Sequence, residues 1–179
     1  MARIAPIPET ELTPSLKVVF ERHMRECSSG ITNMKATLGH SLPAFEAYMQ
    51  WYPLYEEVEK ILGKRLASLY AYTISQAVHC SLCAAFFRKL IADRGENPDR
   101  PELTPAEQAV LDFGKSIGRY HGNIADHVFN IVSGLYSKTA LVALIAFAGQ
   151  MIATNVFNNV VETDIDEYLV AYRPLAQYH

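Results

Sequence analysis

Two helix starts can be read directly from the sequence, and they constrain the fold more than any other feature. Thr13 precedes Pro14, while Thr104 precedes Pro105 and is followed by Glu107 at the third helical position. Threonine is a favoured N-cap residue, proline fits the first helical position, and a glutamate at the third position completes a capping box. We therefore expect helices to begin at Pro14 and Pro105.

Further helices are predicted from the spacing of apolar residues. Apolar side chains recur every three or four positions in six more segments, residues 43–55, 64–78, 80–93, 124–132, 138–157 and 165–172. Valine, isoleucine and threonine never alternate with polar residues over the length of a strand. The sequence predicts an all-α helical bundle, with one domain over residues 1–179.

Composition and charge argue against several classes of partner. The formal net charge is −3, and acidic and basic residues are spread along the chain without the basic stripe typical of nucleic-acid or anionic-membrane binding. The first residues lack the apolar segment of a signal peptide, and the longest apolar run, residues 140–148, is too short to span a bilayer. We expect a cytoplasmic protein, in a compartment that keeps thiols reduced.

Cys80 and Cys83 are the residues most indicative of chemistry. Two cysteines three apart on a helix share a face and can cycle between a dithiol and a disulfide. Zinc half-sites use the same spacing, but a structural zinc site needs four ligands and Cys27 is the only other cysteine. A redox pair is therefore favoured over a metal site, with two cysteines that merely fill a core as the remaining alternative. No cofactor is implied.

The sequence around this pair resembles a known superfamily. Residues 73–83, with Ser75-Gln76 a few positions before the first cysteine, are similar to the redox motif of the alkylhydroperoxidase D (AhpD)-like, carboxymuconolactone decarboxylase superfamily, and the similarity extends to residues 33–43 and 152–159. The resemblance implies an AhpD-like helical bundle, Cys83 as the thiol that attacks a peroxide, and Cys80 as the resolving thiol. It also implies a thiol or disulfide electron donor and a homo-oligomer, namely a dimer, trimer or hexamer.

Two positions depart from the motif of the active peroxidases in this superfamily. Those proteins carry a glutamate twelve residues before the first cysteine and a histidine four residues after the second, where this chain has Ser68 and Phe87. Neither side chain can shuttle a proton as a carboxylate or an imidazole does, and such a group contributes about 10²–10⁴ to a rate. Peroxidase activity of low efficiency is the expectation.

The spacing of this segment also predicts a bend. The twelve residues from Ser68 to Cys80 would extend about 18 Å in a straight helix, so the chain must turn near Val78 and His79 for the two positions to approach each other. The turn would place Cys80 at the start of the next helix, where unpaired N–H groups favour a thiolate. This argument favours Cys80 as the nucleophile, the reverse of what the resemblance implies.

His79 and Tyr72 are candidates to replace the missing proton-handling groups. His79 is adjacent to Cys80, although neighbouring helical residues point about 100° apart, which favours a position beside the site or at the surface. Tyr72 precedes Cys80 by two turns, and a buried tyrosine is more often part of a core.

We interpret the chain as a thiol-dependent enzyme that reduces peroxides or disulfides, with a small-molecule peroxide or a thiol donor as its partner. A carboxymuconolactone-type decarboxylase and a non-catalytic or redox-sensing oligomer are the alternatives. Four aromatic residues in one segment, Tyr48, Trp51, Tyr52 and Tyr55, are expected either at a subunit interface or in the core.

Overall fold

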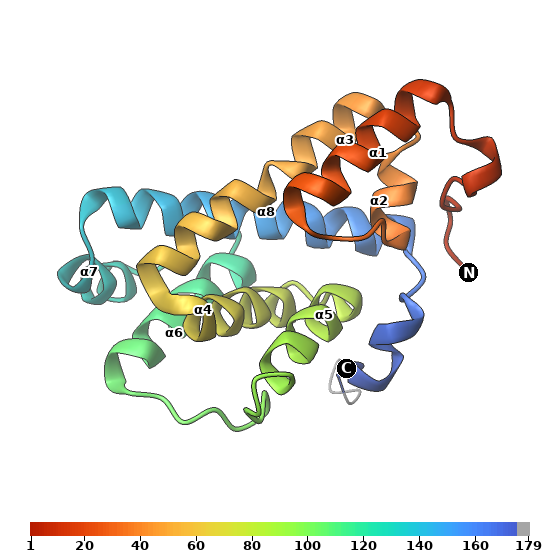
Figure 1. Ribbon diagram of the computed structural model, residues 1–179. Helices are drawn as coiled ribbons and strands as arrows, with labels where there is room; N and C mark the ends of the chain where they lie inside the picture. The colour runs from red at the N-terminus through yellow and green to blue at the C-terminus, as the bar shows by residue number, and fades with distance from the viewer. Residues whose placement is uncertain (175–179) are drawn as a thin grey trace.

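The computed structural model describes residues 1–174 and confirms the all-α class (Figure 1). Within this range there are eight α-helices, two 3-10 helices and no strand. The α-helices are α1 (Pro14–Cys27), α2 (Asn33–Leu38), α3 (Leu42–Met49), α4 (Trp51–Ala77), α5 (Ser81–Ala92), α6 (Pro105–Arg119), α7 (Asp126–Leu135) and α8 (Lys138–Val161). The 3-10 helices are η1 (Glu9–Glu11) and η2 (Glu167–Tyr172).

Both predicted helix starts are confirmed. Helix α1 begins at Pro14, and the Thr13 hydroxyl accepts the Leu16 N–H at 3.3 Å. Helix α6 begins at Pro105 with a complete capping box, in which Thr104 Oγ1 accepts the Glu107 N–H and the Glu107 carboxylate accepts the Thr104 N–H at 2.8 Å. These caps satisfy backbone groups that a helix end would otherwise leave unpaired.

Other predicted boundaries were wrong. The segment 43–55 is divided at Gln50 into α3 and the start of α4, because Pro53 lacks an N–H and its ring clashes with the preceding turn of a continuing helix. In the observed arrangement, Pro53 lies in the first turn of α4, where a backbone N–H has no acceptor within the helix and its absence therefore costs nothing. The segment 165–172 is a 3-10 helix, and the short helix α2 was not predicted, because six residues are too few to show a clear period.

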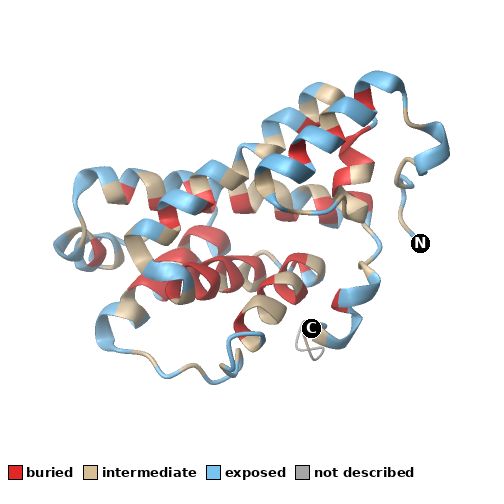
Figure 2. Ribbon diagram, viewed as in Figure 1, coloured by how far each residue is buried: buried red, intermediate tan, exposed pale blue. Residues whose placement is uncertain are grey.

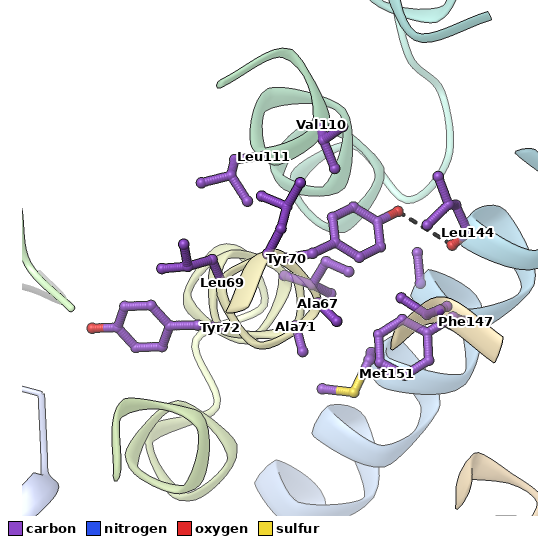
Figure 3. Close-up of a cluster of buried hydrophobic side chains, with 14 of the residues drawn as sticks. Ala67, Leu69, Tyr70, Ala71, Tyr72, Val110, Leu111, Leu144, Phe147 and Met151 are labelled. Carbon is purple, nitrogen blue, oxygen red and sulfur yellow. Dashed lines mark hydrogen bonds between the residues drawn. The ribbon is translucent and has the colours of Figure 1, made fainter. Parts of the chain in front are cut away.

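Helix α4 is bent at Gly63, and its second half forms the centre of the molecule. Gly63 has φ 77°, a left-handed conformation that costs glycine little. The half that follows packs against α5, α6 and α8. Its Tyr70 is fully buried and donates its hydroxyl hydrogen to the Leu144 carbonyl at 3.2 Å (Figure 3). Figure 2 shows buried residues concentrated where these helices meet.

A second, smaller core joins the N-terminal helices to one another. Leu16 and Phe20 from α1 pack with Leu38 of α2 and Phe45 of α3, and Phe157 of α8 packs against them. In Figure 1, α1, α2 and α3 lie together over the C-terminal half of α8. This arrangement brings the N-terminal part of the chain next to the helices that carry the cysteine pair.

The aromatic segment around Trp51 lies inside the monomer. Tyr55 is buried, and Trp51 stacks on it with ring centroids 4.5 Å apart, whereas Tyr48 and Tyr52 are partly buried. Seven exposed large apolar side chains lie on α7 and α8, namely Phe129, Ile131, Leu135, Val142, Ile145, Val156 and Val160, and others lie on α1 and η2. By length and composition alone α8 could cross a membrane, a criterion that core helices of soluble proteins also meet, and a third of its most apolar window is buried.

Candidate active site

The cysteine pair lies at the predicted bend between α4 and α5. Helix α4 ends at Ala77, Val78 caps it, and His79 adopts a left-handed conformation with φ 57°. The Cys80 N–H then returns to the Ser75 carbonyl at 3.0 Å, which closes the turn. A residue in the left-handed conformation ends a helix and turns the backbone sharply, so α5 leaves α4 at a sharp angle.

Cys80 is the N-cap residue of α5. Its backbone is extended, and its sulfur accepts the N–H of Cys83 at 3.3 Å. The side chain is only 1% exposed. The expectation that Cys80 would sit at the start of the second helix is therefore confirmed, one position before the first turn.

Cys83 faces a cavity, while Cys80 does not contribute to its wall. The cavity has a volume of about 410 Å³, and Cys83 forms part of its lining. Asn158 of α8 donates an N–H to this sulfur at 3.3 Å, and the same amide nitrogen lies 3.2 Å from the sulfur of Met34. An amide donor at this distance stabilises negative charge on Cys83 Sγ.

The two thiols have opposite electrostatic environments. A hydrogen bond from the Cys83 thiol lowers the pKa of Cys80, against the opposing effect of burial, and backbone N–H groups at the helix start add to the lowering. Burial, followed by its contact with Cys80, raises the pKa of Cys83 well above its usual value. Of the two thiols, Cys80 is therefore the one that loses its proton more readily, although Cys83 is the residue that lines the cavity.

The cavity walls are mainly aromatic and aliphatic. Trp51 and Tyr52 come from α4, Phe86 and Phe87 from α5, and Met151 from α8. One part of the wall is polar and consists of Ser29, Thr32, Lys35, Asp166 and Glu167. Apolar clefts with a few placed polar groups are typical of small-molecule sites. Residues 1–174 contain no group of three or more histidine, cysteine, aspartate or glutamate side chains arranged to hold a metal ion.

The two positions that depart from the peroxidase motif are connected through Tyr55. The Ser68 hydroxyl is fully buried, lies 2.9 Å from the Tyr55 hydroxyl, and accepts an N–H of Arg94 at 2.7 Å. The Phe87 ring lies on the cavity wall, with its centroid 6.1 Å from that of Tyr55. Hydrophobic and hydroxyl groups thus occupy the positions where the related motif has proton carriers.

The structure does not bring Tyr72 and His79 into the cavity of Cys83. Both line a separate, more polar cavity of about 920 Å³, together with Arg88 and Asp99. The Tyr72 hydroxyl accepts an N–H of Arg88 at 3.2 Å, and Arg88 pairs in turn with the Asp99 carboxylate. Burial is the largest effect on Tyr72 and raises its pKa.

Asn158 and Lys35 are site residues for which the sequence predicted no chemical role. Asn158 belongs to a cluster of asparagines on α8, and hydrogen bonds between helices are enough to explain the presence of that cluster in the sequence. Asn159, from the same cluster, does donate to the Val78 carbonyl at 3.1 Å. Lys35 is 3% exposed, whereas lysine is normally a surface residue. The only sequence signal for either residue is its place within the segments that resemble the superfamily.

No protein-family model matches the chain, and no curated protein matches it. Several solved structures do. The debrominase Bmp8 gives a TM-score of 0.76 at 17% identity, covering 94% of this chain and 95% of that one. A cysteine-to-alanine variant of Bmp8 in complex with 2,3,4-tribromopyrrole gives 0.77 at 17% identity, with 94% of each chain covered.

Two further matches are peroxidase-related. The AhpD core protein of Ralstonia eutropha JMP134, an uncharacterized peroxidase-related protein, gives a TM-score of 0.69 at 13% identity, covering 93% of this chain and 94% of that one. An uncharacterized peroxidase-related protein from Silicibacter sp. TM1040 gives 0.68 at 13% identity, with 91% of each covered. The chain therefore has the AhpD-like fold, in agreement with the resemblance in its sequence.

Proposed function

We propose that this protein is a thiol-dependent reductase in which Cys83 attacks a small apolar substrate and Cys80 resolves the product as a disulfide. The observation that carries the proposal is that Cys83 lines the apolar cavity, its sulfur accepts an N–H from Asn158, and its own N–H is bonded to the sulfur of Cys80. An organic hydroperoxide is the substrate class that the apolar wall favours over hydrogen peroxide, because apolar groups bind by removing apolar surface from water.

Cys80 supplies the base that the missing glutamate and histidine would have supplied. Its thiolate takes the proton of Cys83, whose sulfur then attacks the terminal oxygen of the hydroperoxide. The O–O bond breaks, Cys83 becomes a sulfenic acid, and the alkoxide leaves as an alcohol with the proton held by Cys80. The Asn158 amide stabilises the Cys83 thiolate while it exists.

The second half of the reaction closes the disulfide. The Cys80 thiolate attacks the Cys83 sulfenic sulfur, and hydroxide leaves as water with a proton from solvent. The sum is one hydroperoxide reduced to an alcohol and water, and two thiols oxidised to a disulfide. An external dithiol reduces this disulfide and restores the starting state.

The test is to treat the reduced protein with cumene hydroperoxide and map the modified cysteines by mass spectrometry. We expect a Cys80–Cys83 disulfide in the wild type. Cys80→Ser lacks both the resolving thiol and the base, so dimedone should trap a sulfenic acid on Cys83 at a rate well below that of wild-type oxidation. Cys83→Ser should leave Cys80 a free thiol. Cys27→Ser is the matched control and should behave as wild type, because Cys27 lies at the end of α1 outside this cavity. Free Cys80 and Cys83 thiols after excess hydroperoxide would contradict the proposal.

Reductive dehalogenation of an aromatic ring is the second candidate. The aromatic wall formed by Trp51, Tyr52, Phe86 and Phe87 favours it, as does the likeness to a debrominase whose variant binds a brominated pyrrole. In this reaction the C–halogen bond becomes a C–H bond, two thiols become a disulfide, and the halide leaves with one proton. Release of bromide from tribromopyrrole in the presence of a dithiol, lost in Cys83→Ser, would select this candidate.

A further inference from the structure

The polar part of the cavity wall is built around the Lys35 ammonium. Lys35 lies on α2, and its Nζ donates to the Ser29 hydroxyl at 2.8 Å and to the Gly30 carbonyl at 2.7 Å. The ammonium also lies over the Tyr52 ring, 5.2 Å from the centroid, and the Tyr52 hydroxyl donates to the same Ser29 oxygen at 2.9 Å. These contacts hold the charge in one place on the wall.

The charge of Lys35 is not neutralised by a carboxylate in contact. Its hydrogen-bond partners, Ser29 and Gly30, are neutral, and within residues 1–174 no aspartate or glutamate oxygen lies within 4.0 Å of Nζ. Asp166 acts on it from a longer distance, and its own carboxylate accepts the Asn33 N–H at 2.9 Å. An ammonium has three donors, so one remains beyond the two protein acceptors.

A buried cation without a contacting anion is costly, and a ligand anion would offset that cost. Lys35 and Cys83 line the same cavity of about 410 Å³, and apolar side chains such as Phe86 and Met151 form other parts of its wall. That volume suits one small molecule that reaches both groups.

We propose that the substrate of this site is a small apolar or aromatic molecule bearing an anionic group, which binds at Lys35 while its reactive group faces Cys83. This inference rests on the proposed function only in assigning the cavity as the substrate site. A neutral substrate without an acidic group leaves the ammonium uncompensated, so the site discriminates against it. The charge-assisted hydrogen bond to Lys35 sets the orientation, and the apolar wall supplies most of the contact area.

Trp51 provides a direct readout of binding. It is the only tryptophan of the chain and lines this cavity, so its fluorescence reports a ligand there alone. We would titrate the reduced wild-type protein with 4-bromobenzoate and with 4-bromobenzamide, which has the same shape and no charge. Bromobenzoate should bind roughly tenfold more tightly, the ratio expected for one charge-assisted hydrogen bond.

Variants then test whether Lys35 is the residue that causes the preference for the acid. Lys35→Met should remove the tenfold ratio, Lys35→Arg should keep most of it, and Lys17→Met, an exposed lysine on α1, should leave it unchanged. Equal or weaker binding of the acid by wild-type protein overturns the inference without any variant, as does absence of binding at millimolar concentration. An acid preference that survives in folded Lys35→Met also overturns it.

The outcome is separable from that of the proposed function. Binding needs no thiol chemistry, so an acid preference in a protein whose cysteines ignore hydroperoxides supports the anion site and contradicts the reductase. A hydroperoxide that bears a carboxylate and its amide analogue could also oxidise the cysteines at equal rates. That result supports the reductase and contradicts the preference for an anionic substrate.

Discussion

Replacement of Lys35 by methionine should change how the stability of the protein depends on pH. Burial lowers the pKa of Lys35 from 10.5 to about 8, with Cys27 and Asp166 acting in the opposite direction. Because the folded-state pKa lies below the unfolded-state value, the unfolded chain binds the proton more tightly, and the charged lysine destabilises the fold. The full penalty is present below the folded pKa and disappears as the pH rises through the unfolded value.

The size of the effect follows from that shift. A pKa lowered from 10.5 to about 8 corresponds to about 3 kcal/mol of destabilisation at pH 7, most of which is removed by pH 10. The free energy of unfolding of wild-type protein should therefore rise, relative to that of Lys35→Met, by about 2–3 kcal/mol between pH 7 and pH 10. His23, Cys27, Tyr52 and Asp166 face this lysine and are retained in the variant. The charge of Lys35 acts on the pKa of His23, Cys27 and Asp166, so the difference reports Lys35 together with its coupling to these groups.

Urea unfolding of both proteins at several pH values, under reducing conditions, measures this difference. Lys17→Met serves as the control, because its ammonium is exposed in the folded protein, and its difference from wild type should stay constant. The measured quantity is the free energy of unfolding of wild type minus that of Lys35→Met. If it stays constant or falls as the pH rises, Lys35 is not a buried and uncompensated cation.

Three further predictions concern packing, activity and assembly. Gly114→Ala should lower the free energy of unfolding by about 1–3 kcal/mol, because a Cβ there would lie 2.4 Å from the Tyr70 ring. Gly134→Ala, in α7 with open space around it, should not lower it, and equal urea midpoints for the two variants would refute this. The double variant Ser68→Glu, Phe87→His should raise hydroperoxide turnover by up to about 10²-fold, and an unchanged rate in a folded double variant would mean that another relay operates. The protein should be a homo-oligomer through the exposed apolar face of α7 and α8, and sedimentation of one species near 20.0 kDa at all micromolar concentrations would contradict this.

The fold was predictable from sequence to the extent that local chemistry determines it. Capping by Thr13 and Thr104 acts within four residues, so the starts of α1 and α6 could be located. The bend at His79 followed from the length of the segment 68–80 together with the resemblance, in which position 68 acts beside the cysteine pair. The division at Gln50 was also available in the sequence, since Pro53 cannot lie in a helix interior, but the apolar period there continued across the break.

The site was predictable only in its cysteines. Their spacing is a local signal, whereas the cavity depends on where α2, α4, α5, α8 and η2 meet. Burial of Lys35 is a tertiary effect that no local pattern encodes, and Asn158 has the same sequence context as its neighbour Asn159, which bonds the Val78 carbonyl. Tyr72 and His79 are near the cysteines in sequence, yet the sharp turn directs them to a different cavity.

The cavity wall also has a consequence for how such a protein could diversify. Its polar part comes from residues 29–35 and 166–167, and the Asn33 N–H joins these two segments through its bond to the Asp166 carboxylate. The Asn33 side-chain amide also donates to the carbonyl of Asp164, just before the second segment, at 3.0 Å. The cysteine pair lies on α5, far from both segments in the chain. Exchanges in the two joined segments can therefore alter which molecule is selected while the electron-transferring thiols and their helix start stay intact.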